Sequence, residues 1–591
     1  MFSINTYYKI YKSVQTRLIA IGLGIMLGLS ISSNLWAEDS ELKGSDTITQ
    51  MVSELDSFID DIERDTNQHK GIPIDQDIID SQQNPDVPDA IGNIGPSFYL
   101  TKLDFEGMTR FNDQDMQPYS KLFIKTEVNI GDIKRIAKRI TQRYQAAGYI
   151  TSRAYVPPQT ILDGIVRIKI LEGKIGTIHI EDNHFFKDGV FEQYLKLDDQ
   201  SPFNYKDFES ALYNLNALPD LSVKSYLLSG DAPGTTDILL KAVEKNPLHI
   251  SYNFHNRGVK STHLSRHALN IRHSSLTGRA DMFSGSYFFS EEGAFGGISL
   301  YYKLPRFLSK SDFSINANLI QSMLINHFKS TEVKSKSTSL NGTWDYHLIA
   351  NRDIQFKWVT RFDYKDSKTS VNDNKLSLDR LRILSSGFAF TNGDALGQWQ
   401  IQSALHWGVP DFWGGSQIDE VNSARTGTGG QFNYVSAQAT RIHRLPHKTL
   451  LILRGTGQAT NDLLPTLEQF RAGGRYSVRG YPESDSGGDY GYNFSAEVQI
   501  PLNVNSLPLI NFKKTKPTIR GALFYDTAKT FLKERRSESA NKDRYLAGIG
   551  LGLRINLGSN LNSSLDWGFP IGDSSTDEDK SRFHFDMTYS F

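Results

Sequence analysis

The sequence has no cysteine among its 591 residues, so disulfides, thiolate catalysis and cysteine-ligated zinc sites are excluded. It also has no excess of either charge: 65 Lys and Arg residues stand against 66 Asp and Glu residues, a formal net charge of −1. No overall field therefore favours an anionic partner, and we expect no nucleic acid to bind.

Long hydrophobic runs are scarce as well. The only extended one, Leu18 to Ile31, is shorter than the ~20 apolar residues that a membrane-spanning helix needs. Basic residues precede this run, and a small residue, Ala37, stands before the acidic Glu38. This order predicts a secretory signal peptide over residues 1–37, with a single membrane anchor as the alternative. An exported chain without helical spans belongs to the periplasm, the outer membrane or the exterior.

The segment 38–66 is predicted to contain an amphipathic helix. Its apolar residues recur at helical spacing and share one face: Ile48, Met51, Val52, Leu55, Phe58, Ile59 and Ile62. Residues 67–96 carry four prolines and many polar residues, a composition typical of a flexible linker. The helix either packs on the next domain or acts as a tethered plug that docks elsewhere and leaves.

Two small α/β units are predicted next, over 97–173 and 174–246. In each, a strand, a short helix, a longer helix and two strands follow one another, so the second unit repeats the first. Gly148 stands where a left-handed cap would end the longer helix of the first unit. Neither copy shows a phosphate loop or a catalytic cluster, but their strand edges are able to recruit an extended peptide.

From residue 247 to residue 591 the pattern changes to alternating strands. Segments of about ten residues, separated by polar turns, predict a transmembrane antiparallel β-barrel of about sixteen strands. The last strand shows the pattern best, because its alternate residues are all apolar: Phe583, Phe585, Met587, Tyr589 and Phe591. A soluble β-sandwich is the alternative, but in lipid an open sheet edge would leave backbone groups unpaired, so the sheet must close.

One segment within the barrel region, residues 460–490, lacks an apolar pattern. Its cationic, glycine-hinged tip contains Arg475 and the motif Val478, Arg479, Gly480 and Tyr481. We expect this tip to fold back into the barrel lumen. Counting strands places it between about the eleventh and the twelfth.

These features together resemble the two-partner-secretion outer-membrane transporters, the haemolysin, filamentous-adhesin and contact-dependent-toxin exporters of the POTRA-barrel superfamily. The resemblance covers essentially the whole mature chain, and it implies that the two repeats are polypeptide-transport-associated (POTRA) domains. Asn256–Arg257–Gly258 is similar to the family's first-strand signature. The Arg-Gly-Tyr tip is shared with barrel-assembly insertases, so it indicates the superfamily rather than the function.

The resemblance also implies a partner for the arginine. A family motif, Phe-x-Asp-x-Gly on the barrel wall, appears here as Phe524, Asp526 and Ala528, with alanine in place of the last glycine. The family arrangement implies that Arg479 pairs with Asp526, on about the thirteenth strand. A guanidinium fork matches a carboxylate, and shielding from water strengthens such a pair.

The function expected from this resemblance is secretion of one large partner protein to the cell surface, without covalent catalysis. The expected partners are that protein, recognised by the POTRA domains, the barrel-assembly machinery during biogenesis, and outer-membrane lipid. No metal site or cofactor is expected, since neither the paired histidines His263 and His267 nor any glycine run fits a known motif. The alternatives are an assembly or insertion factor of the same superfamily, a passive porin and a secreted adhesin. The sequence does not identify the cargo.

Overall fold

The computed structural model describes residues 96–196, 201–325, 332–502, 517–533, 543–558 and 560–591. The predicted signal peptide, the 38–66 helix with its apolar face and all but the last residue of the linker lie outside the described residues. The contacts divide the chain into two units. Of the described residues, one unit includes those from 96 to 247 together with Ser274–Ala280, and the other holds Leu248–His273 and Asp281–Phe591.

Among the described residues, no helix combines the length and the apolar character that crossing a bilayer requires.

The first α/β unit is built on one amphipathic helix and a three-stranded sheet. Its elements are β1 (Phe98–Tyr99), β2 (Lys102–Glu106), α4 (Asp113–Ser120), β3 (Glu127–Val128), α5 (Ile130–Ala146), β4 (Arg153–Tyr155) and β5 (Ile165–Leu171). Asn129 caps α5 in a reciprocal capping box with Asp132. Apolar residues of α5, such as Ile136 and Ile140, form the core with Val166 and Ile168 of β5.

The single first strand expected from the alternation is divided in two. β1 pairs with β3, whereas β2 pairs with β5 in parallel. Between them the backbone amide of Thr101 donates to the carbonyl of Gly164, 2.8 Å away, which directs the chain from one sheet to the other.

The second unit repeats the topology of the first. Its elements are β6 (Lys174–Glu181), α6 (Asp188–Leu195), α7 (Tyr205–Asn216), β7 (Leu221–Ser229) and β8 (Thr235–Glu244). In each sheet the last strand lies in the middle, with one parallel and one antiparallel neighbour: β2-β5-β4 and β6-β8-β7. The internal repeat is therefore one of fold as well as of element order.

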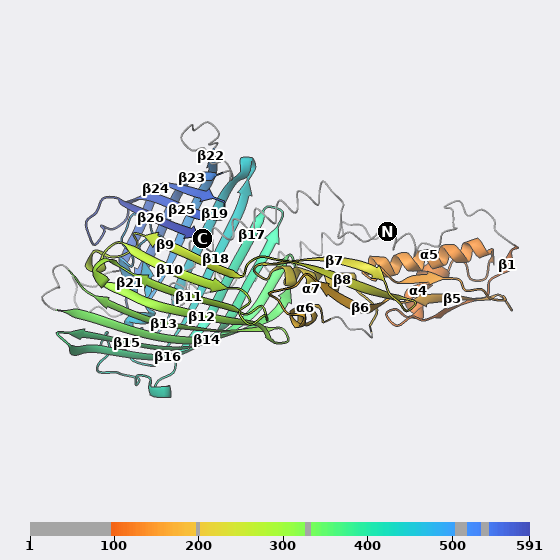
Figure 1. The fold of residues 1–591 in the computed structure, drawn as a ribbon, viewed down its shortest axis with the longest axis horizontal. Helices are drawn as coiled ribbons and strands as arrows, with labels where there is room; N and C mark the ends of the chain where they lie inside the picture. The colour runs from red at the N-terminus through yellow and green to blue at the C-terminus, as the bar shows by residue number, and fades with distance from the viewer. Residues whose placement is uncertain (1–95, 197–200, 326–331, 503–516, 534–542, 559) are drawn as a thin grey trace. The chain divides into compact units, whose positions relative to one another are not determined.

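A closed barrel follows, and its sixteen antiparallel strands confirm the predicted architecture and count (Figure 1). The strands are β9 (Leu248–His255), β10 (Arg266–His273), β11 (Met282–Phe289), β12 (Phe295–Leu308), β13 (Ser311–Met323), β14 (Val333–Ala350), β15 (Ile354–Val371), β16 (Asn374–Asp394), β17 (Gly397–Gly408), β18 (Phe432–Leu445), β19 (Thr449–Ala459), β22 (Tyr490–Leu502), β23 (Thr518–Phe531), β24 (Arg544–Leu557), β25 (Leu561–Pro570) and β26 (Arg582–Ser590).

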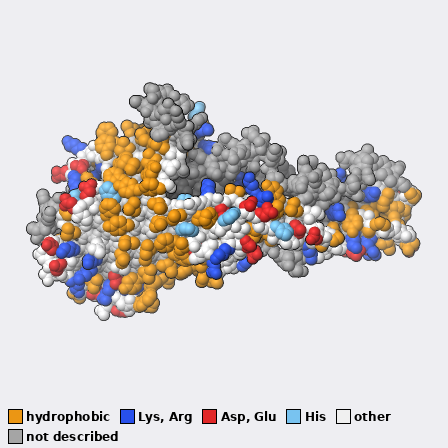
Figure 2. All heavy atoms as spheres, viewed as in Figure 1, with side chains coloured by type: hydrophobic (Ala, Val, Ile, Leu, Met, Phe, Trp, Pro, Cys, Tyr) orange, Lys and Arg blue, Asp and Glu red, His pale blue; other side chains and the backbone are white. Residues whose placement is uncertain are grey.

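Along the barrel strands, apolar side chains that point outward alternate with polar side chains that point into the lumen, as a lipid-embedded barrel requires. Figure 2 shows hydrophobic side chains gathered over the outer face of the barrel. In β26, Phe583 and Tyr589 are exposed on that face, whereas His584 and Asp586 are buried inside. Phe591, predicted as part of this strand, lies one residue beyond it, although its amide still donates to the carbonyl of Ile250 at 3.0 Å.

Several strands are much longer than the ten residues expected. β14 and β15 have 18 residues each and β16 has 21. A tilted strand needs only about 9–11 residues to cross the hydrocarbon. The additional length continues the hairpins beyond the apolar band, where polar side chains stand on both faces.

The barrel closes along a short seam. β26 and β9 share five paired residues, fewer than any other neighbouring pair of barrel strands. The side chain of Asn256 extends this seam, because it donates to the carbonyl of Phe583 and accepts from the amide of Phe585, both at 2.8 Å. The asparagine of the first-strand signature thus replaces a missing backbone partner.

Glu172, just after β5, ties a loop of the first unit to α5. It accepts from the amides of Thr109 and Arg110 at 2.9 and 3.1 Å and from the hydroxyl of Tyr144 at 2.7 Å. Burial alone would raise the pKa of Glu172, but these hydrogen bonds stabilise the carboxylate more, so its pKa lies below the ordinary value of 4.5.

We expect α5 to lose protection when Glu172 is protonated. Since the folded pKa is the lower one, the stabilisation is complete above the unfolded pKa and is lost as the pH falls through the folded pKa. Glu172→Gln should remove this pH dependence. It should also lower the free energy of local opening of α5 at neutral pH by about 1 kcal/mol, a small value because solvent screens a partly exposed carboxylate. Hydrogen exchange of the full-length protein, corrected for intrinsic rates, measures both effects; an unchanged pH profile in the variant would contradict the assignment.

Candidate functional site

The predicted inward segment joins the eleventh barrel strand, β19, to the twelfth, β22. It contains the short helix η6 (Thr466–Glu468) and a small hairpin of β20 (Phe470–Ala472) and β21 (Ser486–Gly488). Its tip contacts the lumenal side chains of β22 to β25, so the segment lies inside the barrel. We call residues 460–489 the inward loop.

The tip is fixed first by apolar packing. Val478 and Tyr481 are completely buried, in one cluster with Phe470, Ala528 and Leu546. Ala528 stands where the family motif has glycine, and its methyl group is part of this apolar cluster. The hydroxyl of Tyr481 also donates to the carbonyl of Asp573 at 2.8 Å.

The structure brings Arg479 and Asp526 together in a bidentate contact. Nε and Nη2 of the guanidinium lie 2.7 and 2.8 Å from Oδ2 and Oδ1 of the carboxylate. The backbone amide of Arg479 adds a third bond at 3.1 Å, and Ser495 donates to the same carboxylate at 2.6 Å. Asp526 lies on β23, the thirteenth strand, as counted from the sequence.

Phe524, the other residue of the wall motif, supports the guanidinium from below. The Arg479 carbon Cζ lies 3.5 Å from the centre of the Phe524 ring. A cation over an aromatic face is attracted by the ring quadrupole, and burial strengthens the attraction. Phe524, two residues before Asp526, faces the same lumen, so one strand supplies both the stacking and the pairing partner.

The pair is part of a larger ionic network that the sequence analysis missed. Arg479 also contacts Glu497 of β22, and its Nη1 lies 3.5 Å from Asp566 of β25. Arg554 of β24 bridges these two carboxylates, 2.9 Å from Glu497 and 2.7 Å from Asp566. Arg475 of the loop pairs with Asp566 at 3.2 Å.

These three arginines and three carboxylates are all buried or nearly so, and Arg475 extends the network to Asp586, 3.8 Å away, which pairs with Arg257 at 3.2 Å. Removing one member leaves its partners charged and without compensation, which costs several kcal/mol in a shielded site, of the order of 3–5. A sequence signal for the missed members exists: Glu497, Arg554 and Asp566 are charged residues at inward positions of the strands after the loop.

Two glycines allow the loop to touch the wall. Gly480 has a φ of 103°, a left-handed conformation that side-chain-bearing residues rarely adopt. Gly548 of β24 stands directly opposite Asp526, and a Cβ placed on it would lie 2.1 Å from the Arg479 carbonyl oxygen. The glycine beside the key carboxylate therefore leaves the space in which the loop backbone lies.

A second anchor holds the base of the inward loop to two other strands of the wall. Glu468, completely buried, accepts from Lys365 of β15 at 3.0 Å and from the hydroxyl of Tyr434 of β18 at 2.8 Å. At the far end of the loop, Asp489 pairs with Arg425, which belongs to the connection between β17 and β18. The loop is thus fastened at both ends as well as at its tip.

The described residues offer no group of three or more candidate ligands for a metal ion. The inward loop is held inside the barrel by ion pairs to several strands, and we call this set of contacts the ionic latch.

Gly548→Ala should displace the tip, because the added methyl group overlaps the Arg479 carbonyl. We expect trypsin to cleave the loop at Arg475 or Arg479 roughly tenfold faster. A loss of about 1.4 kcal/mol in the free energy that holds the tip against the wall corresponds to that factor. The matched control is Gly455→Ala on β19, where an added Cβ meets no atom within 4 Å. Equal cleavage of both variants would show that the close approach does not hold the loop.

Comparison with known proteins finds one family model that matches most of the barrel and another that matches the first α/β unit. The model of the haemolysin secretion/activation protein ShlB/FhaC/HecB family matches residues 234–555, more than half of the chain. The model of the ShlB-type POTRA domain matches residues 98–173, which covers the first α/β unit.

Individual relatives are distant but extensive. The heme/hemopexin transporter protein HuxB of Haemophilus influenzae is 22% identical over 80% of this chain and 83% of its own length. The outer membrane transporter CdiB of Dickeya dadantii is 23% identical over 69% of this chain and 74% of its own. The solved structure of CdiB from Escherichia coli shares the fold, with a TM-score of 0.70 at 19% identity, covering 95% of this chain and all of the other.

The family model, the POTRA domain and the closed sixteen-stranded barrel agree with one another, and the protein is an outer-membrane transporter with periplasmic POTRA domains. The chain belongs to the haemolysin secretion/activation protein ShlB/FhaC/HecB family.

Proposed function

We propose that the protein exports a large partner protein from the periplasm to the cell surface through its barrel. The observation that carries this proposal is the inward loop, whose buried network occupies the lumen but consists of separable ionic contacts. A passive pore needs neither such a latch nor polypeptide-binding modules. The named transport proteins HuxB and CdiB among the relatives support the same class of function.

The POTRA domains are proposed to recognise the partner by strand addition. In the second unit β6 and β7 are the two edges of the sheet, with eight and nine residues each. An extended segment of an unfolded protein can pair with such an edge through its backbone alone. Recognition of this kind fits a partner that arrives before it has folded.

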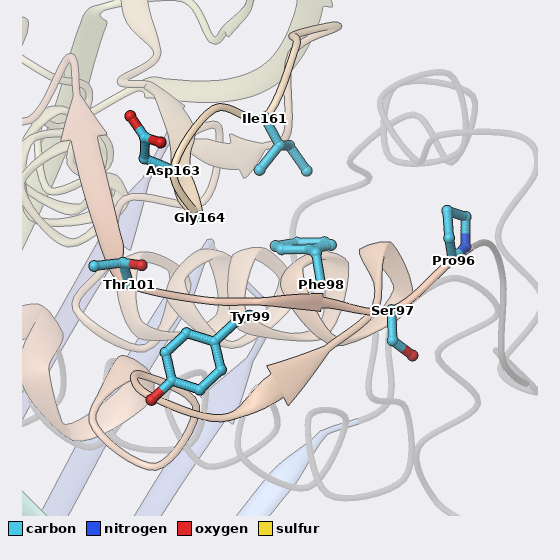
Figure 3. Close-up of a pocket in the computed structure, with 8 residues that line it drawn as sticks. All are labelled: Pro96, Ser97, Phe98, Tyr99, Thr101, Ile161, Asp163 and Gly164. Atoms are coloured by element: carbon cyan, nitrogen blue, oxygen red, sulfur yellow. The ribbon is translucent and has the colours of Figure 1, made fainter.

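The first unit adds a hollow, lined by both apolar and polar residues, that is proposed to take side chains of the same partner. The hollow has a volume of about 540 Å³ and is lined by Pro96 and Gly164 among others. Figure 3 shows Phe98 of β1 and Ile161 on its two sides. Tyr99 and Leu162 nearby are 57% and 69% exposed. Exposed apolar groups at the end of a domain are typical of a surface that binds other chains.

The transport cycle follows from these parts. The 38–66 helix, proposed to plug the barrel at rest, leaves on its linker when the partner binds. The Arg479 tip then moves or guides the chain along the lumen. We propose that no covalent reaction, cofactor or metal takes part, and that folding of the partner outside gives the direction. The barrel-assembly machinery inserts the protein, and outer-membrane lipid surrounds it.

Arg479→Ala should lower secretion of the partner by at least roughly tenfold, because several charges lose their counterion. Arg479→Lys keeps the charge but loses the bidentate fork, so an intermediate loss is expected. The exposed Arg139 of α5, changed to alanine, is the control. Heat-modifiable migration verifies assembly, and normal secretion by an assembled Arg479→Ala barrel would remove the arginine from the mechanism.

Deleting residues 38–66 should raise the conductance of the purified protein in planar bilayers, since the proposed plug is gone. The same deletion tests the role of the helix only. If conductance stays at the level of the intact chain, the segment does not occupy the pore.

The alternative role, as an assembly or insertion factor, predicts a different phenotype. Deleting the gene would deplete many outer-membrane barrels if the protein were an insertase, but would abolish export of one large protein if it is a secretion pore. Quantitative proteomics of outer membranes and culture medium separates the two.

A further inference from the structure

Two lysines stand directly opposite each other on the outer face of the barrel. Lys336 of β14 pairs in register with Lys368 of β15, and both side chains are exposed. Like charges in this position, with Cβ atoms about 5 Å apart, destabilise a sheet. Something must offset that repulsion for the arrangement to be favourable.

The nearby carboxylates in the described residues are committed elsewhere. Lys334, two residues earlier, pairs with Glu332 and Asp373. Asp366 is paired with Arg382, 2.8 Å away, and accepts from the hydroxyl of Tyr364. Within the part of the chain that the structure describes, no ion pair joins either Lys336 or Lys368 to a carboxylate.

The face of the lysine pair is set by the alternation of the strands. Tyr364, Phe362 and Trp358 share the face of Lys368 on β15, and Trp358 is 45% exposed. The residues between them on the strand, such as Asp363 and Lys365, are buried toward the lumen. Lys336 and Lys368 therefore point away from the transport path.

The outward residues of β15 also indicate where the two lysines lie along the membrane normal. The outward residues from Ile354 to Tyr364 form an apolar stretch of about 33 Å along a tilted strand, which crosses about 25 Å of hydrocarbon. β15 is the seventh strand of a barrel whose first strand starts at the periplasmic domains, so it runs outward. Lys368 follows Tyr364 and lies beyond the outer edge of the apolar band.

Aromatic side chains mark that edge independently. The turn after β17 places Trp413 against Phe362 and Tyr364, with ring centres 6.3 and 6.2 Å apart. Trp413 is 68% exposed, although it lies against the outer wall. Exposed tryptophan beside tyrosine is typical of the boundary between hydrocarbon and headgroups.

We propose that Lys336 and Lys368 form a binding site for the phosphate groups of an outer-leaflet phosphorylated glycolipid. A phosphate bridging the two ammonium groups removes their repulsion and gains two charge-assisted hydrogen bonds. Thr338 is exposed on the same face, and the partly exposed Arg380 lies one row nearer the apolar band. The lipid acyl chains then lie along the apolar stretch that ends at Tyr364.

Binding can be measured with the full-length protein in phosphatidylcholine nanodiscs containing diphosphoryl lipid A, by native mass spectrometry. The double variant Lys336→Gln/Lys368→Gln should retain roughly tenfold less lipid A, as expected when two charge-assisted contacts are lost. Lys336→Arg/Lys368→Arg should retain it. The control Lys134→Gln/Lys224→Gln removes two exposed lysines from the POTRA domains and should behave as the unchanged protein.

Three results would overturn the proposal: equal retention by the Lys336→Gln/Lys368→Gln variant, an equal loss in the control, or displacement of lipid A by inorganic phosphate alone.

A separate measurement uses Lys336→Glu, which creates a cross-strand ion pair with Lys368. In detergent without phosphorylated lipid this variant should melt at a higher temperature than the unchanged protein, and added lipid A should no longer stabilise it. A lower melting temperature would show that the lysine pair is not under repulsion.

Discussion

In the hydrocarbon of a bilayer a backbone amide has no water to bond, so every strand must find two neighbours. This constraint governs the architecture from residue 248 onward. It requires closure, and here closure depends on the five paired residues between β26 and β9. Asn256 lengthens that seam with two side-chain hydrogen bonds to β26. A polar side chain thereby reinforces the shortest strand pairing of the closed barrel.

Closure creates a shielded lumen, and the shielding explains the ionic network around the inward loop. Charges in such a place need partners, and two arginines of the loop meet three carboxylates and one arginine from four consecutive strands. Each contact is strong in place, yet none is covalent. Ionic contacts can separate without the breaking of a covalent bond, which fits the proposed movement of the inward loop during export.

The sequence predicted this architecture well because a period of two is visible in single strands. Sixteen strands, two repeats and the position of the loop between the eleventh and twelfth strands were all expected. The pair of Arg479 with Asp526 was expected from family resemblance. Glu497, Arg554 and Asp566 were not, because alternation shows which face a residue occupies but not which loop will lie against it. The length of β14 to β16 was underestimated for a related reason: strand pairing continues beyond the apolar band, where no hydrophobic pattern marks it.

The inward tip Arg475–Tyr481 shows what each level determines. By itself the sequence determined that a cationic, glycine-hinged segment interrupts a series of amphipathic strands, since composition and periodicity are local properties. Only the tertiary structure decided that Gly548 makes room for the tip and that Glu468 meets Lys365 across 103 residues. It also set Lys336 opposite Lys368. These contacts depend on strand register and on closure of the barrel, which are properties of the whole sheet.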